Sequence, residues 1–511
     1  MNASVNPKMN GGPSSDASRV LEMVIIGAGF GGLGMAIRML QEGRKDFLLL
    51  EKADDVGGTW RENSYPGAAC DVQSHMYSFS FAPKTDWSKR YAERPEIYNY
   101  IQETTEKFGL RQYLKFNAEV VGAQFDEQNA FWTLNLKDGS VLTTKFVVLA
   151  SGPLHVPQIP NYKGMEKFKG KIFHSAQWDH SYDLTGKKVA SIGTGGSAIQ
   201  YIPEIAPLVK QLDVYQRTPA WVIPRDERKY GNFDKALFEK VPFARQIHRA
   251  RLYWSNESRV MPIFHPKIME TAQKAIELFI RYQVKGDKAL AKKLTPNYVM
   301  GCKRILISNK YYPTFTRKNV DLILDSIQEF TETGIITRDG THREADCVVL
   351  GTGFIVDPRI YMKDFPCTGL NGRELMNDWK DGAEAFYGIS VAGYPNLFQL
   401  VGPNTALGHN SIIFMIEAQA NYILDAIKTV EKKKADYLDV KPDVQAEFND
   451  NVQKKLKGTV WQNGGCVSWY QQADGKNFTI WPGYTWRYWM ETRKIKPSAY
   501  NFVKVKAKQA V

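Results

Sequence analysis

Two glycine-rich segments constrain the fold of this chain more than any other feature of its sequence. The first follows the short apolar run 21–26, where Gly27, Gly29 and Gly32 stand in the spacing GxGxxG before a helix-competent apolar stretch. A strand, a glycine turn and a helix start form a phosphate cradle, because glycines let the backbone approach a pyrophosphate and the helix amides receive its charge. A second apolar run ends in Glu51, at the spacing of the acid that holds a ribose 2′-hydroxyl. This context favours a dinucleotide site over the alternative, a glycine turn with a surface glutamate.

The second segment repeats this arrangement further along the chain. A short apolar run leads into Gly193, Gly195 and Ala198 in the spacing GxGxxA. Ser197 can offer a hydroxyl group to a phosphate at the helix start, and Thr194 belongs to the same predicted binding set. The sequence therefore predicts two separate dinucleotide sites.

The strand expected after this second helix ends in Arg217 and Thr218 instead of an acid. A carboxylate there would repel a 2′-phosphate, whereas a guanidinium group binds a phosphate in a bidentate manner. We therefore expect NADPH rather than NADH in the second site, with both residues in the binding set. The alternative is that Arg217 is an ordinary solvated residue on the rim of the domain.

Length and composition indicate a globular protein of two or three domains. The 511 residues carry a formal net charge of +13, which two phosphate-rich cofactors would partly use, and no nucleic-acid motif accompanies this charge. No apolar run approaches the roughly 18 residues of a membrane span, and the polar N-terminus lacks the apolar core of a signal peptide. We expect a cytoplasmic protein without integral membrane contact, as a monomer or weak oligomer.

The five cysteines are odd in number and show no CxxC spacing. This pattern argues against a disulfide framework and against a zinc site. We therefore expect no metal.

A short string between the two cradles, FKGKIFHSAQWD, adds a more specific signal. Its pattern FxGxxxHxxxWD is formed by Phe168, Gly170, His174, Trp178 and Asp179. From the residues alone it indicates a linker with a turn and a buried tryptophan. The string nevertheless resembles the fingerprint of Baeyer–Villiger monooxygenases, flavoproteins that insert an oxygen atom beside a ketone carbonyl. The related N- and S-oxygenating flavin monooxygenases usually carry Tyr or Phe in place of Trp178.

The stretch 57–71, GGTWRENSYPGAACD, resembles a second motif of that family, GGxWxxxxYPGxxxD. The predicted FAD-binding set here comprises Thr59, Trp60, Asp71, Tyr77 and Val120. Without the resemblance, Trp60 would be interpreted as a core aromatic and Asp71 as a helix cap. Disulfide reductases share the two-nucleotide layout but carry a redox-active cysteine pair in this stretch, whereas this chain has only Cys70.

The segment 301–315, GCKRILISNKYYPTF, resembles the family segment in which the lysine helps to bind the 2′-phosphate and the arginine reaches the flavin. The resemblance implies these roles for Lys303 and Arg304, with Asp71 close to Arg304. In the implied reaction NADPH reduces FAD, and dioxygen captured as a C4a-peroxide attacks the ketone. A permanently charged donor suits both the deprotonated peroxide and the oxyanion that follows, so Arg304 and Asp71 are the predicted catalytic residues.

The predicted fold class is α/β, with two doubly wound, Rossmann-like dinucleotide-binding domains for FAD and NADP and a helical insertion. The expected divisions are a disordered tail 1–19, an FAD domain 20–152, an NADP domain 153–225, a helical insertion 226–300, a second NADP part 301–356, and a second FAD part with the C-terminal region 357–511. The insertion is basic and amphipathic, and a solvated face over a core stripe is favoured over membrane contact. The C-terminal aromatics are expected mainly in the core, with one or two lining an apolar substrate chamber.

The predicted function is an FAD- and NADPH-dependent Baeyer–Villiger oxidation of a ketone to an ester or lactone with dioxygen. The segment 71–83 is similar to members that act on open-chain aliphatic ketones. The alternative is an N- or S-oxygenating flavin-containing monooxygenase. An NADPH-dependent disulfide reductase and a non-enzymatic basic surface-binding protein are disfavoured.

Overall fold

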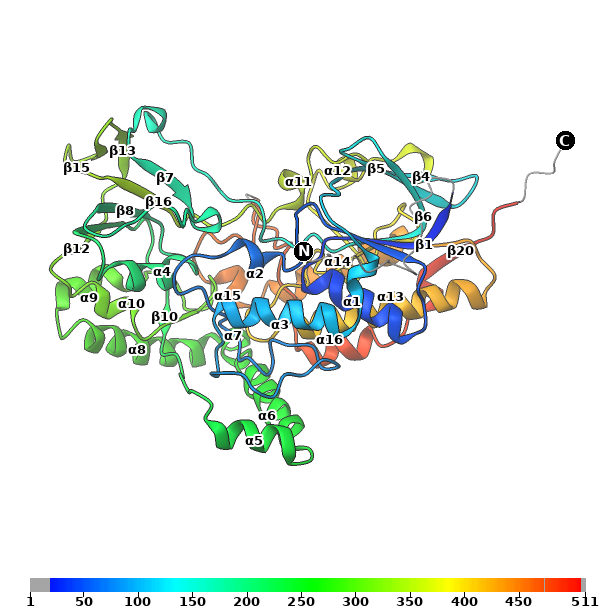
Figure 1. Ribbon diagram of the computed structural model, residues 1–511, viewed down its shortest axis with the longest axis horizontal. Coiled ribbons are helices and arrows are strands. Elements are labelled where there is room, and N and C mark those ends of the chain that lie inside the picture. The colour runs from blue at the N-terminus through cyan, green and yellow to red at the C-terminus, as the bar shows by residue number, and fades with distance from the viewer. Residues whose placement is uncertain (1–18, 473, 507–511) are drawn as a thin grey trace, which may run out of the picture.

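The computed structural model describes residues 19–472 and 474–506. The tail predicted at residues 1–19 therefore lies outside the described part, except for Arg19. Figure 1 shows the two largest sheets at opposite ends of the molecule, with helices between and below them. This α/β arrangement is the one that the two glycine segments predict.

The first large sheet has eight strands in the order β17-β4-β5-β6-β1-β2-β3, and β18 pairs with β6. Its strands are β1 (Val20–Ile26), β2 (Phe47–Leu50), β3 (Leu114–Lys115), β4 (Val120–Asp126), β5 (Phe131–Leu136), β6 (Val141–Leu149), β17 (Cys367–Thr368) and β18 (Leu397–Gln399). Strand β1 runs parallel to both of its neighbours, β2 and β6. Because both faces of β1 are covered, Met23, Val24 and Ile25 are all fully buried.

The second large sheet has five parallel strands in the order β12-β9-β8-β16-β7. Its strands are β7 (Lys171–His174), β8 (Lys188–Ile192), β9 (Gln211–Tyr215), β12 (Val320–Ile323) and β16 (Cys347–Leu350). Smaller sheets are formed by β10 (Val222–Ile223) with β11 (Leu306–Ile307), by β13 (Ile327–Phe330), β14 (Gly334–Thr337) and β15 (His342–Glu344), and by β19 (Tyr437–Val440) with β20 (Tyr500–Val503). Parallel strands need crossover connections, which the helices supply.

Helices cover the sheets and carry the long connections. Outside the predicted insertion they are α1 (Phe30–Gln41), α2 (Thr59–Glu62), α3 (Arg94–Lys107), α4 (Ala198–Ile205), α10 (Tyr311–Thr314), α11 (Pro358–Tyr361), α12 (Leu375–Asp378), α13 (Ile412–Lys432), α14 (Pro442–Leu456), α15 (Val460–Asn463) and α16 (Thr485–Glu491). Short 3-10 turns are η1 (Leu110–Tyr113), η2 (Met165–Lys167), η3 (Ser175–Gln177), η4 (Leu370–Gly372) and η5 (Pro497–Ala499). The buried helix α13 packs against α1, which begins directly after the first glycine turn.

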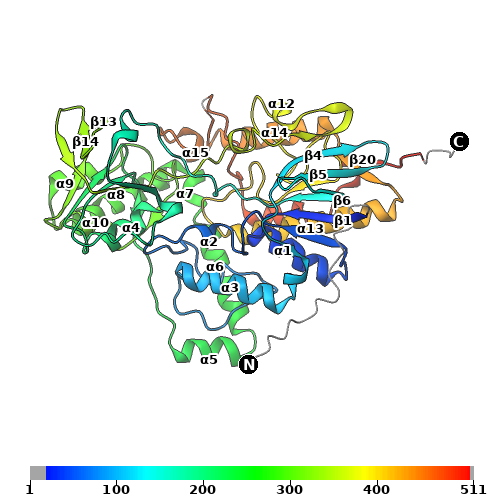
Figure 2. The same cartoon turned by 45° about the horizontal axis from the view of Figure 1, so that its top comes forward.

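The stretch 226–300 is helical, with α5 (Asn232–Lys240), α6 (Ala244–Ser258), α7 (Met261–Phe264), α8 (Pro266–Gln283) and α9 (Lys288–Leu294). In Figures 1 and 2, α5 lies at the outer edge of the molecule, whereas α8 and α9 lie beside the second large sheet. No helix among the described residues is long and apolar enough to cross a membrane.

The interpretation of the cysteines was wrong for one pair. Cys302 and Cys466 form a disulfide although 164 residues separate them in the sequence. Spacing along the chain did not reveal this pair, because only the tertiary fold brings the two Cα atoms to 6.2 Å from each other. The other three cysteines, Cys70, Cys347 and Cys367, are free and buried.

Candidate functional site

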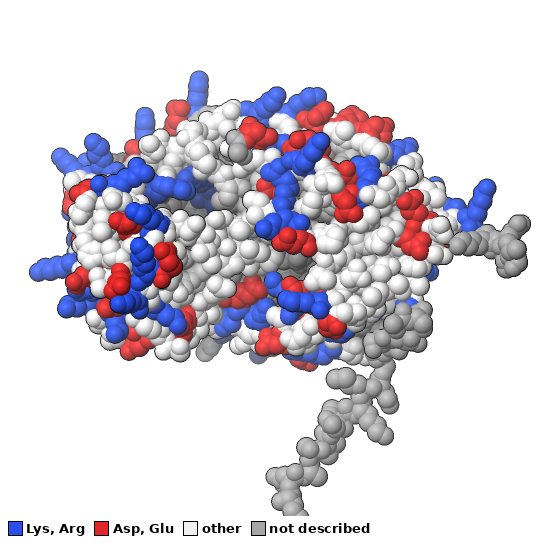
Figure 3. Space-filling view, turned by 90° about the horizontal axis from the view of Figure 1, so that it is seen from above, with Lys and Arg blue, Asp and Glu red and all other residues white. Residues whose placement is uncertain are grey.

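A single large cavity receives both glycine turns. Its volume is about 1610 Å³, and its walls come from the carboxyl ends of strands in both large sheets. Ligands of open α/β sheets bind in the crevice at this edge. Figure 3 shows Lys and Arg side chains gathered over the end of the molecule that carries the second sheet.

The first glycine turn connects β1 to α1 and lines the cavity through Gly27 and Gly29. A Cβ at Gly32 would lie 1.9 Å from the carbonyl oxygen of Gly27, so only glycine lets α1 pack this tightly against the turn. Glu51 follows β2 and is buried, and its carboxylate accepts hydrogen bonds from the backbone N–H groups of Ala28 at 2.8 Å and Ala53 at 3.0 Å. These contacts place the acid beside the turn, as a ribose-binding carboxylate requires.

The second glycine turn connects β8 to α4. Gly193, Thr194, Gly195 and Ser197 line the cavity, whereas Ala198 is fully buried beneath them as the first residue of α4. The hydroxyl of Thr194 donates a hydrogen bond to the carbonyl of Thr218 at 3.0 Å, which ties the turn to the loop after β9. A Cβ at Gly195 would meet no heavy atom within 4 Å, so this turn is open to a ligand.

Two cations converge on this second turn. Arg217 and Lys303 both line the cavity, and neither forms an ion pair with a carboxylate in the described part of the chain. Burial and the charge of Arg217 lower the pKa of Lys303, whose ammonium group lies 5.1 Å from the centre of the Tyr298 ring. Two cations close enough to affect one another, without a protein counter-charge, are suited to an anionic ligand such as a phosphate.

Arg304 and Asp71 form a bidentate pair on the cavity wall. Arg304 Nε lies 2.9 Å from Asp71 Oδ2, and Arg304 Nη2 lies 2.8 Å and 2.6 Å from the two carboxylate oxygens. The two side chains are 39% and 27% exposed because they face the cavity. The Asp71 carboxylate raises the pKa of Arg304 and outweighs the opposing effect of burial, so the guanidinium group stays charged.

The other residues of the predicted FAD set also line the cavity: Thr59, Trp60, Tyr77 and Val120. The indole N–H of Trp60 donates to the hydroxyl of Tyr77 at 3.1 Å, and their rings meet edge to face. Burial raises the pKa of Tyr77, so its hydroxyl stays protonated. Beside them, burial raises the pKa of the free Cys70 thiol, which is therefore a poor nucleophile.

No side chain of the FxGxxxHxxxWD string lines the cavity. Phe168 packs on Phe330 in the core of the second sheet, and a Cβ at Gly170 would lie 2.5 Å from the carbonyl oxygen of Asp346. His174 ends β7, and its Nδ1 accepts a hydrogen bond from the backbone of Ala176 at 3.1 Å.

The end of the string packs against the same sheet. The Trp178 ring contacts Phe173 and Tyr201, and Asp179 forms an ion pair with Lys171 at 2.7 Å. In this structure the string therefore shapes the edge of the second sheet rather than the cavity surface.

The structure adds cavity residues that the sequence analysis did not identify. Among the aromatic residues of the last hundred positions, Trp469 and Phe478 line the cavity, and so do Val467 and Ser468, which directly precede Trp469. Asn410 also lines it and donates a hydrogen bond at 2.7 Å to the buried carboxylate of Glu257. Gln200 of helix α4 also lines the cavity, and its side-chain oxygen accepts a hydrogen bond from the Tyr65 hydroxyl at 2.9 Å, which links α4 to the stretch 57–71. No spacing pattern marks these residues, because their positions depend on contacts between distant segments.

Two dinucleotide turns that open onto one cavity, with a fixed arginine on its wall, define a protein that brings two nucleotide cofactors together. The flavin-binding monooxygenase-like family model matches residues 20–261. A Baeyer–Villiger monooxygenase of Pseudomonas aeruginosa is 45% identical over 96% of this chain and 93% of its own length. A Baeyer–Villiger monooxygenase of Streptomyces coelicolor is 42% identical over 95% of this chain and 93% of its own. The chain therefore belongs to the Baeyer–Villiger monooxygenase family.

Solved structures show the same fold. An oxidised steroid monooxygenase bound to NADP matches with a TM-score of 0.86 at 30% identity, over 95% of this chain and 100% of that chain. Cyclohexanone monooxygenase from Rhodococcus sp. Phi1, bound to NADP⁺, matches with a TM-score of 0.83 at 27% identity, over 95% and 99%. OTEMO in complex with FAD and NADP matches with a TM-score of 0.85 at 26% identity, over 94% and 99%. The predicted fold class is confirmed.

Proposed function

We propose that this enzyme uses FAD, NADPH and dioxygen to convert a ketone into an ester or lactone. The observation that carries the proposal is the Arg304–Asp71 pair, which lies on the wall of the cavity that both dinucleotide turns share. The balanced reaction consumes one ketone, one NADPH, one proton and one O₂, and yields the ester, NADP⁺ and water.

The first turn, Glu51 and the Trp60–Tyr77 pair are assigned to FAD, with Thr59, Asp71 and Val120 completing the set. The second turn is assigned to NADPH, and Arg217, Thr218 and Lys303 are assigned to its 2′-phosphate. When bound, FAD accepts hydride from NADPH and activates dioxygen, which is chemistry of the cofactor itself. The protein supplies binding, orientation and a fixed charge.

Arg304 is assigned the central catalytic role. Its guanidinium group stays positive and points into the cavity, where it can donate hydrogen bonds to an oxyanion that forms on the attacked ketone carbonyl. Asp71 holds two of its nitrogen atoms, which fixes the direction of the remaining donors. A preorganised donor of this kind stabilises developing charge without reorganising during the reaction.

Open-chain aliphatic ketones are the proposed substrates. The cavity that Arg304 lines also carries apolar side chains, including Leu407, Ile412 and Trp469, which suit an alkyl chain. We also propose the domain division 20–152 and 357–511 for FAD, 153–225 and 301–356 for NADP, and 226–300 as the insertion. A cytoplasmic location and a monomeric or weakly associated state stay predictions.

Product mass spectrometry with NADPH, air and a medium-chain 2-alkanone tests the function. An ester one oxygen atom heavier than the ketone is the expected product. Arg304→Ala should still bind FAD and oxidise NADPH but make no ester, because the oxyanion loses its donor. Arg359→Ala, which removes a guanidinium group paired with Asp357 outside the proposed catalytic pair, is the matched control and should still make ester. Normal ester formation by Arg304→Ala would contradict the catalytic role of Arg304. If the native enzyme forms only hydrogen peroxide, the 2-alkanone is not its substrate.

A further inference from the structure

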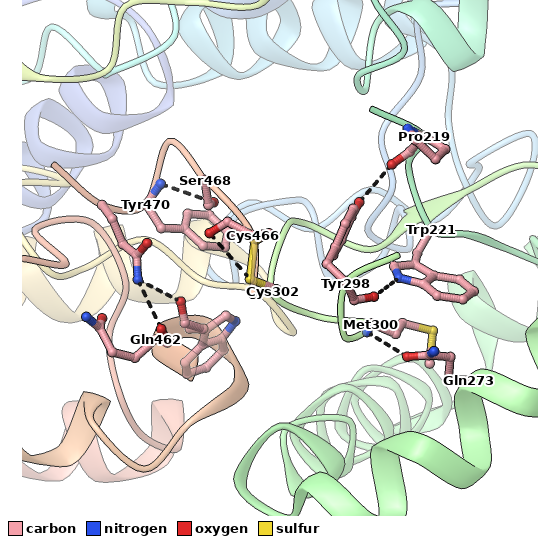
Figure 4. Close-up of a disulfide and its surroundings, with 12 residues drawn as sticks. Pro219, Trp221, Gln273, Tyr298, Met300, Cys302, Gln462, Cys466, Ser468 and Tyr470 are labelled. Atoms are coloured by element: carbon pink, nitrogen blue, oxygen red, sulfur yellow. Dashed lines mark hydrogen bonds between the residues drawn. A yellow bond between two sulfur atoms is a disulfide. The ribbon is translucent and has the colours of Figure 1, made fainter. Parts of the chain in front are cut away.

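The Cys302–Cys466 disulfide connects two segments that both reach the cavity. Cys302 directly precedes Lys303 and Arg304, and Cys466 directly precedes the cavity residues Val467, Ser468 and Trp469. Figure 4 shows the disulfide between these two segments, with Tyr470 and Ser468 on one side and Tyr298 and Met300 on the other. The disulfide therefore lies next to the proposed catalytic arginine in the chain, although it belongs to no assigned site.

The segment that carries Cys302 is firmly held. The carbonyl of Tyr298 accepts a hydrogen bond from the Trp221 indole at 2.9 Å, and its hydroxyl donates to the carbonyl of Pro219 at 3.0 Å. The backbone N–H of Met300 donates to the side chain of Gln273 on α8 at 3.1 Å. These contacts anchor residues 298–302 to the connection between β9 and β10 and to helix α8 (Figure 4).

The loop that carries Cys466, residues 465–470, has few hydrogen bonds to the rest of the protein. Within the described chain, its hydrogen bonds run only among its own residues or to Gln471 and Cys302. Val467 is 92% exposed and Trp469 is 39% exposed, whereas Ser468 and Tyr470 between and after them are buried, so the loop packs through alternate side chains. The disulfide is the one covalent attachment between this loop and the anchored segment.

The end of this loop lies within electrostatic reach of the proposed catalytic pair. Tyr470 is buried, and burial raises its pKa to about 12 although the positive charge of Arg304 opposes the rise. A displacement of the loop would therefore change both the cavity wall at Trp469 and the surroundings of Arg304.

We propose that Cys302 and Cys466 are positioning residues, whose disulfide holds the loop 465–470 in place beside Arg304, and that a dithiol reductant which opens it lowers the yield of oxygenated product per NADPH. The proposal rests on the proposed function, because the yield refers to that reaction. An opened loop admits water and disturbs the substrate wall, so more of the oxygen activated with NADPH leaves as hydrogen peroxide.

The opening is an ordinary thiol–disulfide exchange. A thiolate of the dithiol attacks the Cys466 sulfur, which is the accessible one because Cys466 is partly exposed whereas Cys302 is buried. The S–S bond breaks and Cys302 leaves as a thiolate that takes up a proton. The second thiol of the reagent then closes its own disulfide and releases the Cys466 thiol. Two electrons and two protons pass from the dithiol to the protein.

The test compares the FAD-loaded enzyme before and after treatment with dithiothreitol. Alkylation under denaturing conditions and mass spectrometry should find three free cysteines before treatment and five after it. The ester formed per NADPH should fall by about threefold or more on reduction and recover when oxidised glutathione restores the bond. The double variant Cys302→Ser/Cys466→Ser should resemble the reduced enzyme and ignore dithiothreitol.

Hydrogen exchange gives a readout that does not depend on the reaction. Reduction should increase deuterium uptake in a peptide that spans residues 464–470 and leave β1 and β8 unchanged. Faster exchange in the loop without ester from any ketone would keep the positioning role and reject the proposed function. Unchanged exchange or unchanged product yield in a verified reduced enzyme would overturn the positioning proposal, as would five free thiols before treatment.

Discussion

Replacing Arg217 with alanine is expected to impair the use of NADPH and to leave the use of NADH nearly unchanged. The two coenzymes differ only in the 2′-phosphate, and Arg217 lies on the cavity wall beside the second glycine turn. Among the described residues no carboxylate pairs with Arg217, so its removal leaves no buried acid without a partner. The variant therefore tests phosphate recognition rather than folding.

The expected magnitude follows from the kind of contact. A hydrogen bond to a charged group contributes about 1.5–3 kcal/mol. Because Arg217 is exposed, solvent screening favours the lower half of that range, about 1.5–2 kcal/mol. Since 1.36 kcal/mol is a factor of ten, kcat/KM for NADPH should fall roughly 10- to 30-fold. For NADH the change should stay within about twofold.

Steady-state kinetics with both coenzymes at low and at high salt measures this difference. The NADPH effect should shrink as salt screens the charge. Lys187→Ala is the matched control, since it removes one exposed positive charge just before β8, at the end of that strand opposite the glycine turn. Equal losses for NADPH and NADH in Arg217→Ala, or an equal loss in the control, would refute the assignment of Arg217 to the 2′-phosphate.

Three further predictions concern a cation, a buried acid and a glycine. Burial and the charge of Arg217 lower the pKa of Lys303, so NADPH binding should weaken as the pH rises into the alkaline range. Lys303→Arg should shift this loss of binding to higher pH, because a guanidinium group stays charged. Measuring KM for NADPH against pH tests this, and identical pH profiles for the variant and the native enzyme would contradict it. Burial raises the pKa of Asp439 from 3.8 to about 6. The contribution of its protonated carboxyl group to folding stability is therefore complete below pH 3.8 and is lost as the pH rises through about 6. Asp439→Asn keeps an acceptor for the Gly393 N–H and should be more stable than the native enzyme by about 3 kcal/mol at neutral pH. Urea unfolding should show that this difference in stability disappears near pH 4. A stability difference that does not change with pH would reject the ionised Asp439 as its cause. Gly170→Ala should lower stability by about 1–3 kcal/mol, because its Cβ would lie 2.5 Å from both the Asp346 carbonyl oxygen and the Phe168 ring. Thermal unfolding measures this loss. Gly186→Ala is the control, because its Cβ would meet nothing within 4 Å and its φ of +70° adds backbone strain alone. If the two variants lose the same stability, the close approach at Gly170 is not what requires glycine.

The sequence alone determined the local units of the fold. A strand, a glycine turn and a helix start are adjacent in the chain, and their geometry follows from backbone sterics and from glycine spacing within about ten residues. The turns at Gly27 and Gly193, and Glu51 at the end of β2, are therefore readable without coordinates. Arg217 is equally local, since it lies two residues after the end of β9.

Contacts between residues far apart in the chain depend on the complete fold. Arg304 and Asp71 lie 233 residues apart in the chain, and the family resemblance suggested their contact whereas spacing did not. The Cys302–Cys466 disulfide escaped the sequence analysis because cysteine spacing carries no information on a pair closed by long-range packing. For the same reason the pattern of aromatics could not show that Trp469 lines the cavity while Trp461 and Trp481 are buried. Which face of a side chain is covered depends on packing between segments far apart in sequence, and that is a property of the whole fold.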